Sequence, residues 1–291
     1  MSVRTAVVAI RRVGAGASTV DHDLVAAEAP VAIEVTRAER TEPRSLGVLM
    51  RTPGEDDDLV RGWLFTERII AADSDIHSLT LREAPPDDPN ASGDRITVTL
   101  APHIDLDRLV ENRALTPSSA CGLCGRLEVE RVDQLRMAGS AGGADVVFSP
   151  GVISSVPRTL REAQAVFAET GGLHAAGLFD SAGRLLLVRE DIGRHNAVDK
   201  LVGAALSAHR LPATACLLAV SGRIAFEIVQ KAVAAGVVAV VAVGAPSSLA
   251  VEAARATGLT LVGFARDGRF NVYAGHDRIA SPGSSPTAPL R

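Results

Sequence analysis

The chain has 291 residues, of which 47% are hydrophobic and 22% are charged, and its formal net charge is −4. This composition is typical of a soluble globular protein with one large or two ordinary domains, and it excludes disorder over most of the length. The lack of a basic excess and the 3% aromatic content argue against general nucleic-acid binding. The three cysteines are too few for a disulfide scaffold.

The N-terminal half predicts a flexible N-terminus over residues 1–25 and then a small α+β domain over residues 26–150. Short apolar runs and alternating patterns indicate strands, and an acidic first turn suits the amino end of an amphipathic helix. The predicted elements are strands at 31–37, 45–51, 76–83 and 94–100 and a helix at 55–70.

The C-terminal half predicts an α/β domain over residues 151–279, followed by a flexible tail over 280–291. Near-continuous Val, Leu and Ala strands that alternate with helices indicate a mostly parallel sheet with helices on both faces. Pro157 suits a first helical position, and Ser221 and Ser247 or Ser248 suit helix caps. The predicted elements are helices at 157–170, 195–209, 223–235 and 248–257 and strands at 175–179, 185–189, 215–220, 237–243, 259–265 and 270–273.

The uncharged stretch at residues 232–251 is long enough to raise the question of a membrane span. Gly244, Pro246 and the two following serines interrupt it, so a buried strand and a capped helix are the better prediction. The early apolar run at residues 5–10 is too short for a signal peptide. We therefore expect a cytoplasmic protein without a membrane segment.

Three turns follow strands whose carboxyl ends are predicted to share one edge of the parallel sheet. They occupy residues 221–223, 244–247 and 266–269. Ligands of such sheets bind outside the carboxyl ends of the strands. Free backbone N–H groups in these turns, with arginines in two of them, would suit an anion. The sequence therefore predicts a phosphate-bearing ligand at this edge.

A CxxC motif, formed by Cys121 and Cys124, lies in a predicted loop at residues 111–127. The spacing leaves open a zinc half-site, thiol chemistry in which the pair forms a redox disulfide or passes on sulfur, and no chemistry at all. A helix start near Cys121 would favour its thiolate. A closed zinc site needs four ligands, and the sequence has no second CxxC. Cys216 lies in an apolar run and is predicted to be a small buried hydrophobe.

Polar residues gather in two further segments. His174 lies between glycines and small residues at a strand start, where it could contact a ligand or be a structural histidine. Residues 189–200 carry many charged side chains between a predicted strand and a predicted helix. A bound anion would offset the positive charges of Arg194 and His195 at the start of that helix. The alternative is a solvated turn. Glu227 and Lys231 are predicted to form an i,i+4 pair.

Several segments, taken in order, resemble one family. They are SSACGLCG, TGGLHAAGLF, REDIGRHNAVDKLVGAAL, SGRIAFEIVQKA, APSSLAVEAA and LTLVGFARDGRFNVY. The same order occurs in formate dehydrogenase accessory sulfurtransferases, the FdhD/NarQ family. The resemblance spans about residues 30 to 279, and REDIGRHNAVDK is its most specific segment.

The resemblance implies a sulfurtransferase. Such proteins take sulfane sulfur as a cysteine persulfide from a cysteine desulfurase. They pass it to the molybdenum or tungsten bis(molybdopterin guanine dinucleotide) cofactor, which formate dehydrogenase then uses. It also implies a cytidine-deaminase-like, three-layer α/β C-terminal domain and a homodimer, and no permanently bound metal is expected.

The same resemblance assigns the site residues. Cys121 matches the cysteine that bears the persulfide, and Cys124 matches the second cysteine of the loop. The residues that match the cofactor-binding segment, or lie in family motifs around the same pocket, are Phe264, Ala265, Arg266, Asp267, Gly268, Arg269, His174, Arg194, His195, Ser221 and Arg223.

Three rival functions make different demands on the sequence. A zinc deaminase needs His-x-Glu and Pro-Cys-x-x-Cys, but Ala120 precedes the CxxC and the sequence has no His-x-Glu. A dithiol oxidoreductase would carry its CxxC after a strand, whereas here a loop rich in Pro and Ser precedes it. A cofactor-binding chaperone of apo-formate dehydrogenase, with incidental cysteines, is the alternative that involves no enzyme chemistry.

Overall fold

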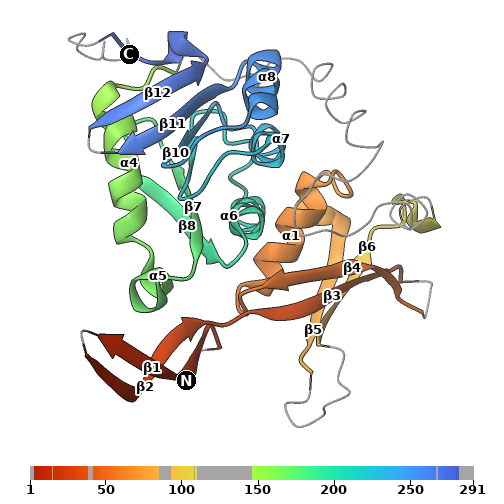
Figure 1. The fold of residues 1–291 in the computed structure, drawn as a ribbon. Helices are drawn as coiled ribbons and strands as arrows, with labels where there is room; N and C mark the ends of the chain where they lie inside the picture. Colours follow the sequence, from red (N-terminus) through yellow and green to blue (C-terminus); the bar gives the residue numbers. More distant parts are fainter. Residues whose placement is uncertain are drawn as a thin grey trace.

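The computed structural model describes residues 3–14, 16–38, 42–84, 93–107, 109, 146–266 and 268–281. Within these residues the chain forms a two-stranded, a four-stranded and a six-stranded sheet, with helices packed on the two larger ones (Figure 1). The predicted α/β class is confirmed.

The first sheet corrects the prediction of a flexible N-terminus. β1 (Thr5–Gly14) and β2 (Ala17–Ala26) pair as an antiparallel hairpin. Arg11 and Arg12 follow the apolar run at residues 5–10 and give the sequence no local signal of a longer strand. In the structure Arg12 donates to Asp21 on the facing strand at 2.7 Å, and the strand continues. A cross-strand ion pair of this kind offsets like-charge repulsion on the hairpin surface.

The four-stranded sheet has the order β4-β3-β6-β5 and carries α1 (Asp56–Thr66) on its inner face. Its strands are β3 (Ala29–Thr36), β4 (Arg44–Arg51), β5 (Ile76–Arg82) and β6 (Asp94–Leu100), and the short helix η1 (Asp73–Asp75) precedes β5. Alternate residues of β3, namely Val31, Ile33 and Val35, are fully buried against α1. The predicted strands and helix of this half are confirmed.

The six-stranded sheet has the order β12-β11-β10-β9-β7-β8. Its strands are β7 (His174–Phe179), β8 (Leu185–Asp191), β9 (Leu217–Val220), β10 (Ala239–Ala242), β11 (Thr260–Arg266) and β12 (Arg269–Ala274). The three central strands β9, β10 and β11 pair in parallel, while β7 and β12 pair antiparallel with their neighbours.

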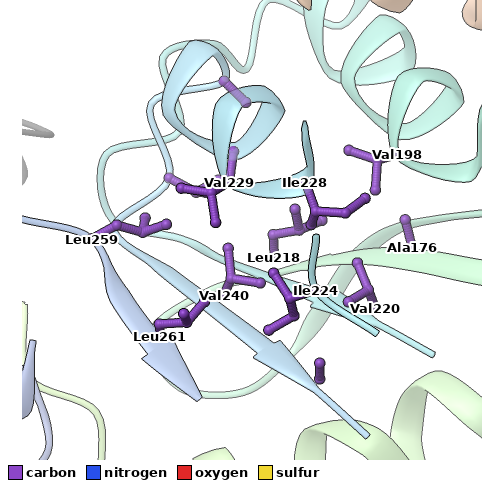
Figure 2. Packing of buried hydrophobic residues seen from close by; sticks show 14 of the residues in the cluster. Ala176, Val198, Leu218, Val220, Ile224, Ile228, Val229, Val240, Leu259 and Leu261 are labelled. Atoms are coloured by element: carbon purple, nitrogen blue, oxygen red, sulfur yellow. The ribbon is translucent and has the colours of Figure 1, made fainter. Parts of the chain in front are cut away.

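Helices cover both faces of this sheet and give the predicted three layers (Figure 1). One face carries α6 (Arg194–Ser207), α7 (Phe226–Ala234) and α8 (Ser248–Thr257), and the other carries α4 (Pro150–Glu162). Along β9, Leu218 and Val220 belong to the same hydrophobic cluster as Val198 of α6 and Ile228 of α7 (Figure 2), while Leu217 and Ala219 pack on the α4 side. Each such Leu or Val contributes about 1.5–3 kcal/mol through burial.

The start of the C-terminal half differs from the prediction. Ser149 caps α4 by accepting a hydrogen bond from the Val152 N–H at 3.2 Å, and Pro157 lies inside the helix instead of at its first position. The predicted single helix to residue 170 is two helices, α4 and α5 (Ala165–Thr170). Phe148 pairs with Ile279, the residue that directly follows the short helix η2 (His276–Arg278). Residues 148–150 therefore belong with the C-terminal half.

The uncharged run folds as predicted. β10 is fully buried, Ser247 caps α8 through the Ala250 N–H at 3.2 Å, and Gly258 ends that helix at φ 67°. Of the helices in the described ranges, none has the length and apolar character that crossing a membrane requires.

Candidate functional site

The predicted turns meet at one edge of the six-stranded sheet. The Gly244 N–H donates to the Gly222 carbonyl, and the Phe264 N–H donates to the Gly244 carbonyl, each at 3.2 Å. A Cβ atom on Gly244 would lie 2.8 Å from the Gly222 oxygen, so only glycine allows this approach. The turns after β9 and β10 therefore lie side by side, next to Phe264 near the end of β11, at the carboxyl ends of the parallel strands.

These contacts correct one part of the prediction. The N–H groups of Gly244 and Ser247 are not free to bind an anion, since they donate to the carbonyls of Gly222 and Ile224. The predicted anion site must therefore depend more on side chains. Arg223, Arg266 and Arg269 are exposed, and Arg266 and Arg269 pair across the turn between β11 and β12.

His174, Ser221 and Arg194 converge beside Gly222. A Cβ atom on Gly222 would lie 3.4 Å from the His174 imidazole and 3.7 Å from Cδ of Arg194. Ser221 was predicted to cap a helix, which is wrong. Its Oγ accepts a hydrogen bond from the Ala175 N–H at 2.9 Å and lies 3.5 Å from Nδ1 of His174. Burial, and then the charge of Arg194, lower the pKa of His174, which favours a neutral imidazole.

His195 lies next to this group, at the start of α6. Its Nε2 is 3.9 Å from Oε2 of Glu227, which belongs to the first turn of α7. Burial lowers the pKa of His195 to about 3, and the positive charges of Arg194 and Lys231 and the nearby His174 act in the same direction. The imidazole is therefore neutral at pH 7, and it can accept as well as donate a hydrogen bond.

The predicted pair of Glu227 and Lys231 is wrong. The Lys231 ammonium donates to both carboxylate oxygens of Asp199, at 2.8 and 2.9 Å, and to the Thr66 hydroxyl at 3.0 Å. Asp199 is fully enclosed, and burial raises its pKa. The i,i+4 spacing on α7 could not reveal this, because both partners of Lys231 lie on other helices.

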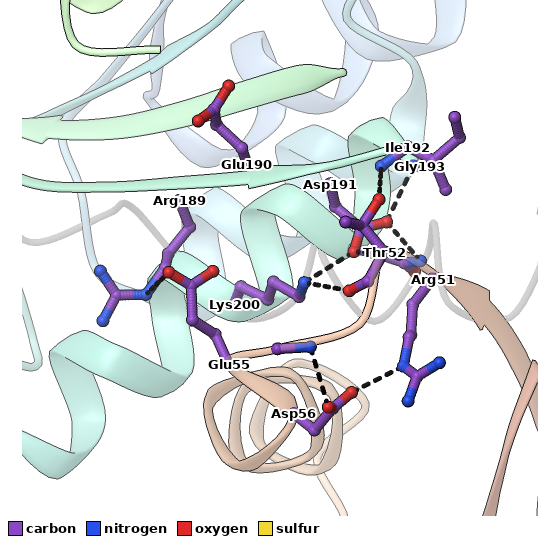
Figure 3. A network of polar contacts seen from close by, with 12 residues as sticks. Arg51, Thr52, Glu55, Asp56, Arg189, Glu190, Asp191, Ile192, Gly193 and Lys200 are labelled. Carbon is purple, nitrogen blue, oxygen red and sulfur yellow. Dashed lines mark hydrogen bonds and ion pairs between the residues drawn. The ribbon is translucent and has the colours of Figure 1, made fainter. Parts of the chain in front are cut away.

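The segment that precedes Arg194 is bound to the N-terminal half (Figure 3). Oδ2 of Asp191 accepts from the Thr52 N–H at 3.0 Å and from Lys200 at 2.9 Å. Its Oδ1 accepts from the Gly193 N–H at 2.9 Å and from Asn196 at 3.0 Å. Asp191 and Lys200 are completely buried. This network fixes the turn that carries Arg194 and His195.

The segment 264–269, which is predicted to bind a cofactor, is only partly exposed. Phe264 is 41% exposed and has a left-handed backbone with φ 53°. Ala265 is fully buried in the core on the α4 side, so its side chain does not reach the edge. Gly268 has φ 74°, which suits glycine in the turn between Arg266 and Arg269. Asp267 lies outside the described residues.

Cys121 and Cys124 also lie outside the described residues, so the structure does not place the predicted CxxC loop. Cys216 is a free thiol, half-buried beside the core of the C-terminal half, and burial raises its pKa. Among the residues that the structure does describe, no group of three or more His, Cys, Asp or Glu side chains could hold a metal ion.

The fold and this edge define an α/β protein with a candidate ligand site of arginine, histidine and serine side chains at the ends of its parallel strands. The model of the FdhD/NarQ family matches residues 26–280, and this chain belongs to that family.

Relatives of known name are similar over almost the whole chain. The sulfur carrier protein FdhD of Streptomyces coelicolor is 42% identical over 269 residues, which cover 92% of this chain and 93% of that protein. The protein of the same name in Nocardia farcinica is 45% identical over 260 residues and 89% of each chain.

A solved structure is similar as well. The crystal structure of a putative formate dehydrogenase accessory protein from Desulfotalea psychrophila superposes with a TM-score of 0.70 and 25% sequence identity. The match covers 95% of this chain and 99% of the other, so the similarity includes both halves of the molecule.

Proposed function

We propose that this chain is a sulfur carrier that serves formate dehydrogenase maturation. The observation that carries the proposal is the 42% identity, over 92% of the chain, to a protein named as a sulfur carrier. Membership of the FdhD/NarQ family and the similarity to a formate dehydrogenase accessory protein support it. The chain would act in the cytoplasm as a homodimer between a cysteine desulfurase and formate dehydrogenase.

In this proposal Cys121 carries the sulfur. The Cys121 thiolate attacks the outer sulfur of the persulfide on the desulfurase, and a new S–S bond forms as the desulfurase thiolate leaves. Sulfur moves to Cys121 without net oxidation or reduction. Cys124, three residues on, assists the later transfer or the release of the sulfur. The chain is then a sulfurtransferase with a cysteine persulfide as its intermediate.

The acceptor is the molybdenum or tungsten bis(molybdopterin guanine dinucleotide) cofactor, which binds as cargo at the edge of the six-stranded sheet. Each of its two dinucleotides carries a pyrophosphate, and the guanidinium groups of Arg223, Arg266 and Arg269 suit phosphate oxygens. Arg194, His174, His195 and Ser221 supply further polar contacts, and exposed Phe264 offers a ring on which a flat base can stack.

Sulfur loading tests the first half of the proposal. The purified chain is incubated with a cysteine desulfurase and cysteine. The mass of the peptide that contains Cys121 and Cys124 is then measured by mass spectrometry. We expect one added sulfur on the peptide with Cys121, and none in Cys121→Ala. Cys216→Ala is the matched control and should load normally, because its half-buried thiol has a raised pKa. Equal loading of Cys121→Ala and the wild type would contradict the assignment.

Formate dehydrogenase activity in cells distinguishes the rival functions. If the activity survives replacement of both Cys121 and Cys124, the chain is a binding chaperone and not a sulfurtransferase. A dithiol oxidoreductase would instead show catalytic disulfide turnover with the wild type and no added sulfur on either cysteine.

Binding tests the second half. Guanosine diphosphate is a suitable probe, since it carries a guanine and a pyrophosphate, as each half of the cofactor does. Calorimetry should show binding to the wild type and a loss of about tenfold or more in affinity for Arg266→Ala, because a charged hydrogen bond contributes about 1.5–3 kcal/mol. Unchanged affinity in Arg223→Ala, Arg266→Ala and Arg269→Ala alike would move the ligand away from this edge.

A further inference from the structure

Two buried polar atoms lie opposite each other beside the proposed pocket, and neither has a hydrogen-bond partner among the residues that the structure describes. They are Nε2 of His195 and Oε2 of Glu227, 3.9 Å apart. The side chains are only 19% and 12% exposed. Buried polar atoms in folded proteins nearly always have a partner, and an orphan calls for an explanation. Because the two atoms are only 3.9 Å apart, a small rotation of either side chain would bring them within hydrogen-bonding distance.

The chemistry of the pair fixes where the proton lies. A carboxylate only accepts hydrogen bonds, so Glu227 can satisfy His195 only when Nε2 carries the proton. A neutral imidazole has one proton, and Nδ1 then keeps its lone pair. A carboxylate that accepts a hydrogen bond from one ring nitrogen of a histidine fixes both the tautomer and the orientation of the imidazole ring.

The charges around His195 keep the imidazole neutral. Arg194 on the same helix, Lys231 on α7 and His174 on β7 act together with burial to lower its pKa to about 3. The imidazole is therefore neutral at pH 7.

We propose that Glu227 is a positioning residue that holds His195 in the tautomer with the proton on Nε2, so that Nδ1 accepts a hydrogen bond from the ligand. The ligand group is an N–H or O–H donor, such as the amide or amino group of a purine or a ribose hydroxyl. The inference rests on the proposed function for the location of the ligand. The hydrogen bonds among the described residues include none to Nδ1 of His195.

The tautomer can be observed directly by ¹⁵N NMR of the histidine side chains, with the His195 signals assigned from their loss in His195→Gln. We expect a proton on Nε2 in the wild type at pH 7. Glu227→Gln keeps an acceptor oxygen and should keep this tautomer, whereas Glu227→Met removes both oxygens and should shift the population toward the Nδ1 proton. Glu169→Met removes an exposed carboxylate on α5 and should change nothing.

Guanosine diphosphate binding is the second measurement. Glu227→Met should weaken binding about tenfold, the loss expected for one hydrogen bond of about 1.4 kcal/mol, and Glu227→Gln should restore most of it. The inference would be overturned if His195 of the wild type carried its proton on Nδ1, a result that does not depend on whether any variant folds. It would also be overturned if the Glu227→Met spectrum were identical to that of the wild type. Failure of the wild type to bind the nucleotide would instead contradict the proposed function, since the tautomer is observed without ligand.

Discussion

Gly62 of α1 and Gly203 of α6 lie against each other where the two helices cross. A Cβ atom on Gly62 would lie 1.8 Å from the Asp199 carbonyl oxygen, and one on Gly203 would lie 1.9 Å from that of Asp58. No side chain fits at either position, so the backbones themselves are in contact. This crossing joins the N-terminal half to the helix that begins with Arg194 and His195.

Gly203→Ala should therefore destabilise the protein, because the added methyl group must push two helix backbones apart. We expect a loss of about 1–3 kcal/mol or more, as for overpacking of a close contact. Gly151→Ala is the control, since its nearest neighbour to the added Cβ is Ser149 Oγ at 3.8 Å and the helix tolerates the change. Urea unfolding of both variants checks this, and equal midpoints would contradict the close contact.

The sequence allowed most elements of the fold to be predicted. Apolar periodicity identified strands such as β9, β10 and β11 and the capped helix α8, because these depend on local patterns of burial and capping. The meeting of the turns at one sheet edge followed from the parallel order of the strands. The hairpin β1–β2 was missed, since the pairing of Arg12 with Asp21 is a contact between strands and not a local pattern.

The contacts between helices were beyond sequence reasoning. Nothing local indicates that Gly62 meets Gly203, that Lys231 pairs with Asp199, or that Glu227 approaches His195. The residues of each pair come from different helices, and tertiary packing selects them over the i,i+4 partners that spacing suggests. The density of charges in residues 189–200 was the one available signal, and the structure explains it as a buried network.

Asp191→Asn should weaken the joint between the two halves. The change leaves the Lys200 ammonium, which is completely buried, without its counter-ion at 2.9 Å. An uncompensated buried charge costs about 3–5 kcal/mol. Urea unfolding should show this loss, and adding Lys200→Met should recover part of it, because the double variant buries no unpaired charge. A double variant no more stable than Asp191→Asn would show that the cost has another origin.

The stability of the protein should fall as the pH is lowered through the range in which the unfolded chain protonates His195. Its pKa is about 3 in the folded state and 6.5 when unperturbed. Between these values the unfolded state binds more protons than the folded state, so stability is fully present above about pH 6.5 and declines toward about pH 3. The lowered pKa of His174 acts in the same direction.

Urea unfolding at about pH 7.5, 6.5 and 5.5 measures this dependence. One such histidine contributes a slope of up to about 1.4 kcal/mol per pH unit within its window. His195→Asn removes the titrating group, so its stability should depend less steeply on pH than that of the wild type. Parallel curves for the two proteins would mean that His195 is not neutral in the folded state.

Phe264 combines a backbone conformation with φ 53° and a side chain that is 41% exposed. The left-handed conformation costs a residue with a Cβ about 1–2 kcal/mol. The proposed role in binding would explain the arrangement, because base–aromatic stacking is worth about 1–3 kcal/mol. Phe264→Leu keeps the strain and removes the ring, and Phe264→Trp keeps a ring. We expect both to unfold within about 1 kcal/mol of the wild type. Calorimetry with guanosine diphosphate should show about tenfold weaker binding for the Leu variant alone, and equal affinity of the two variants would exclude stacking on this side chain.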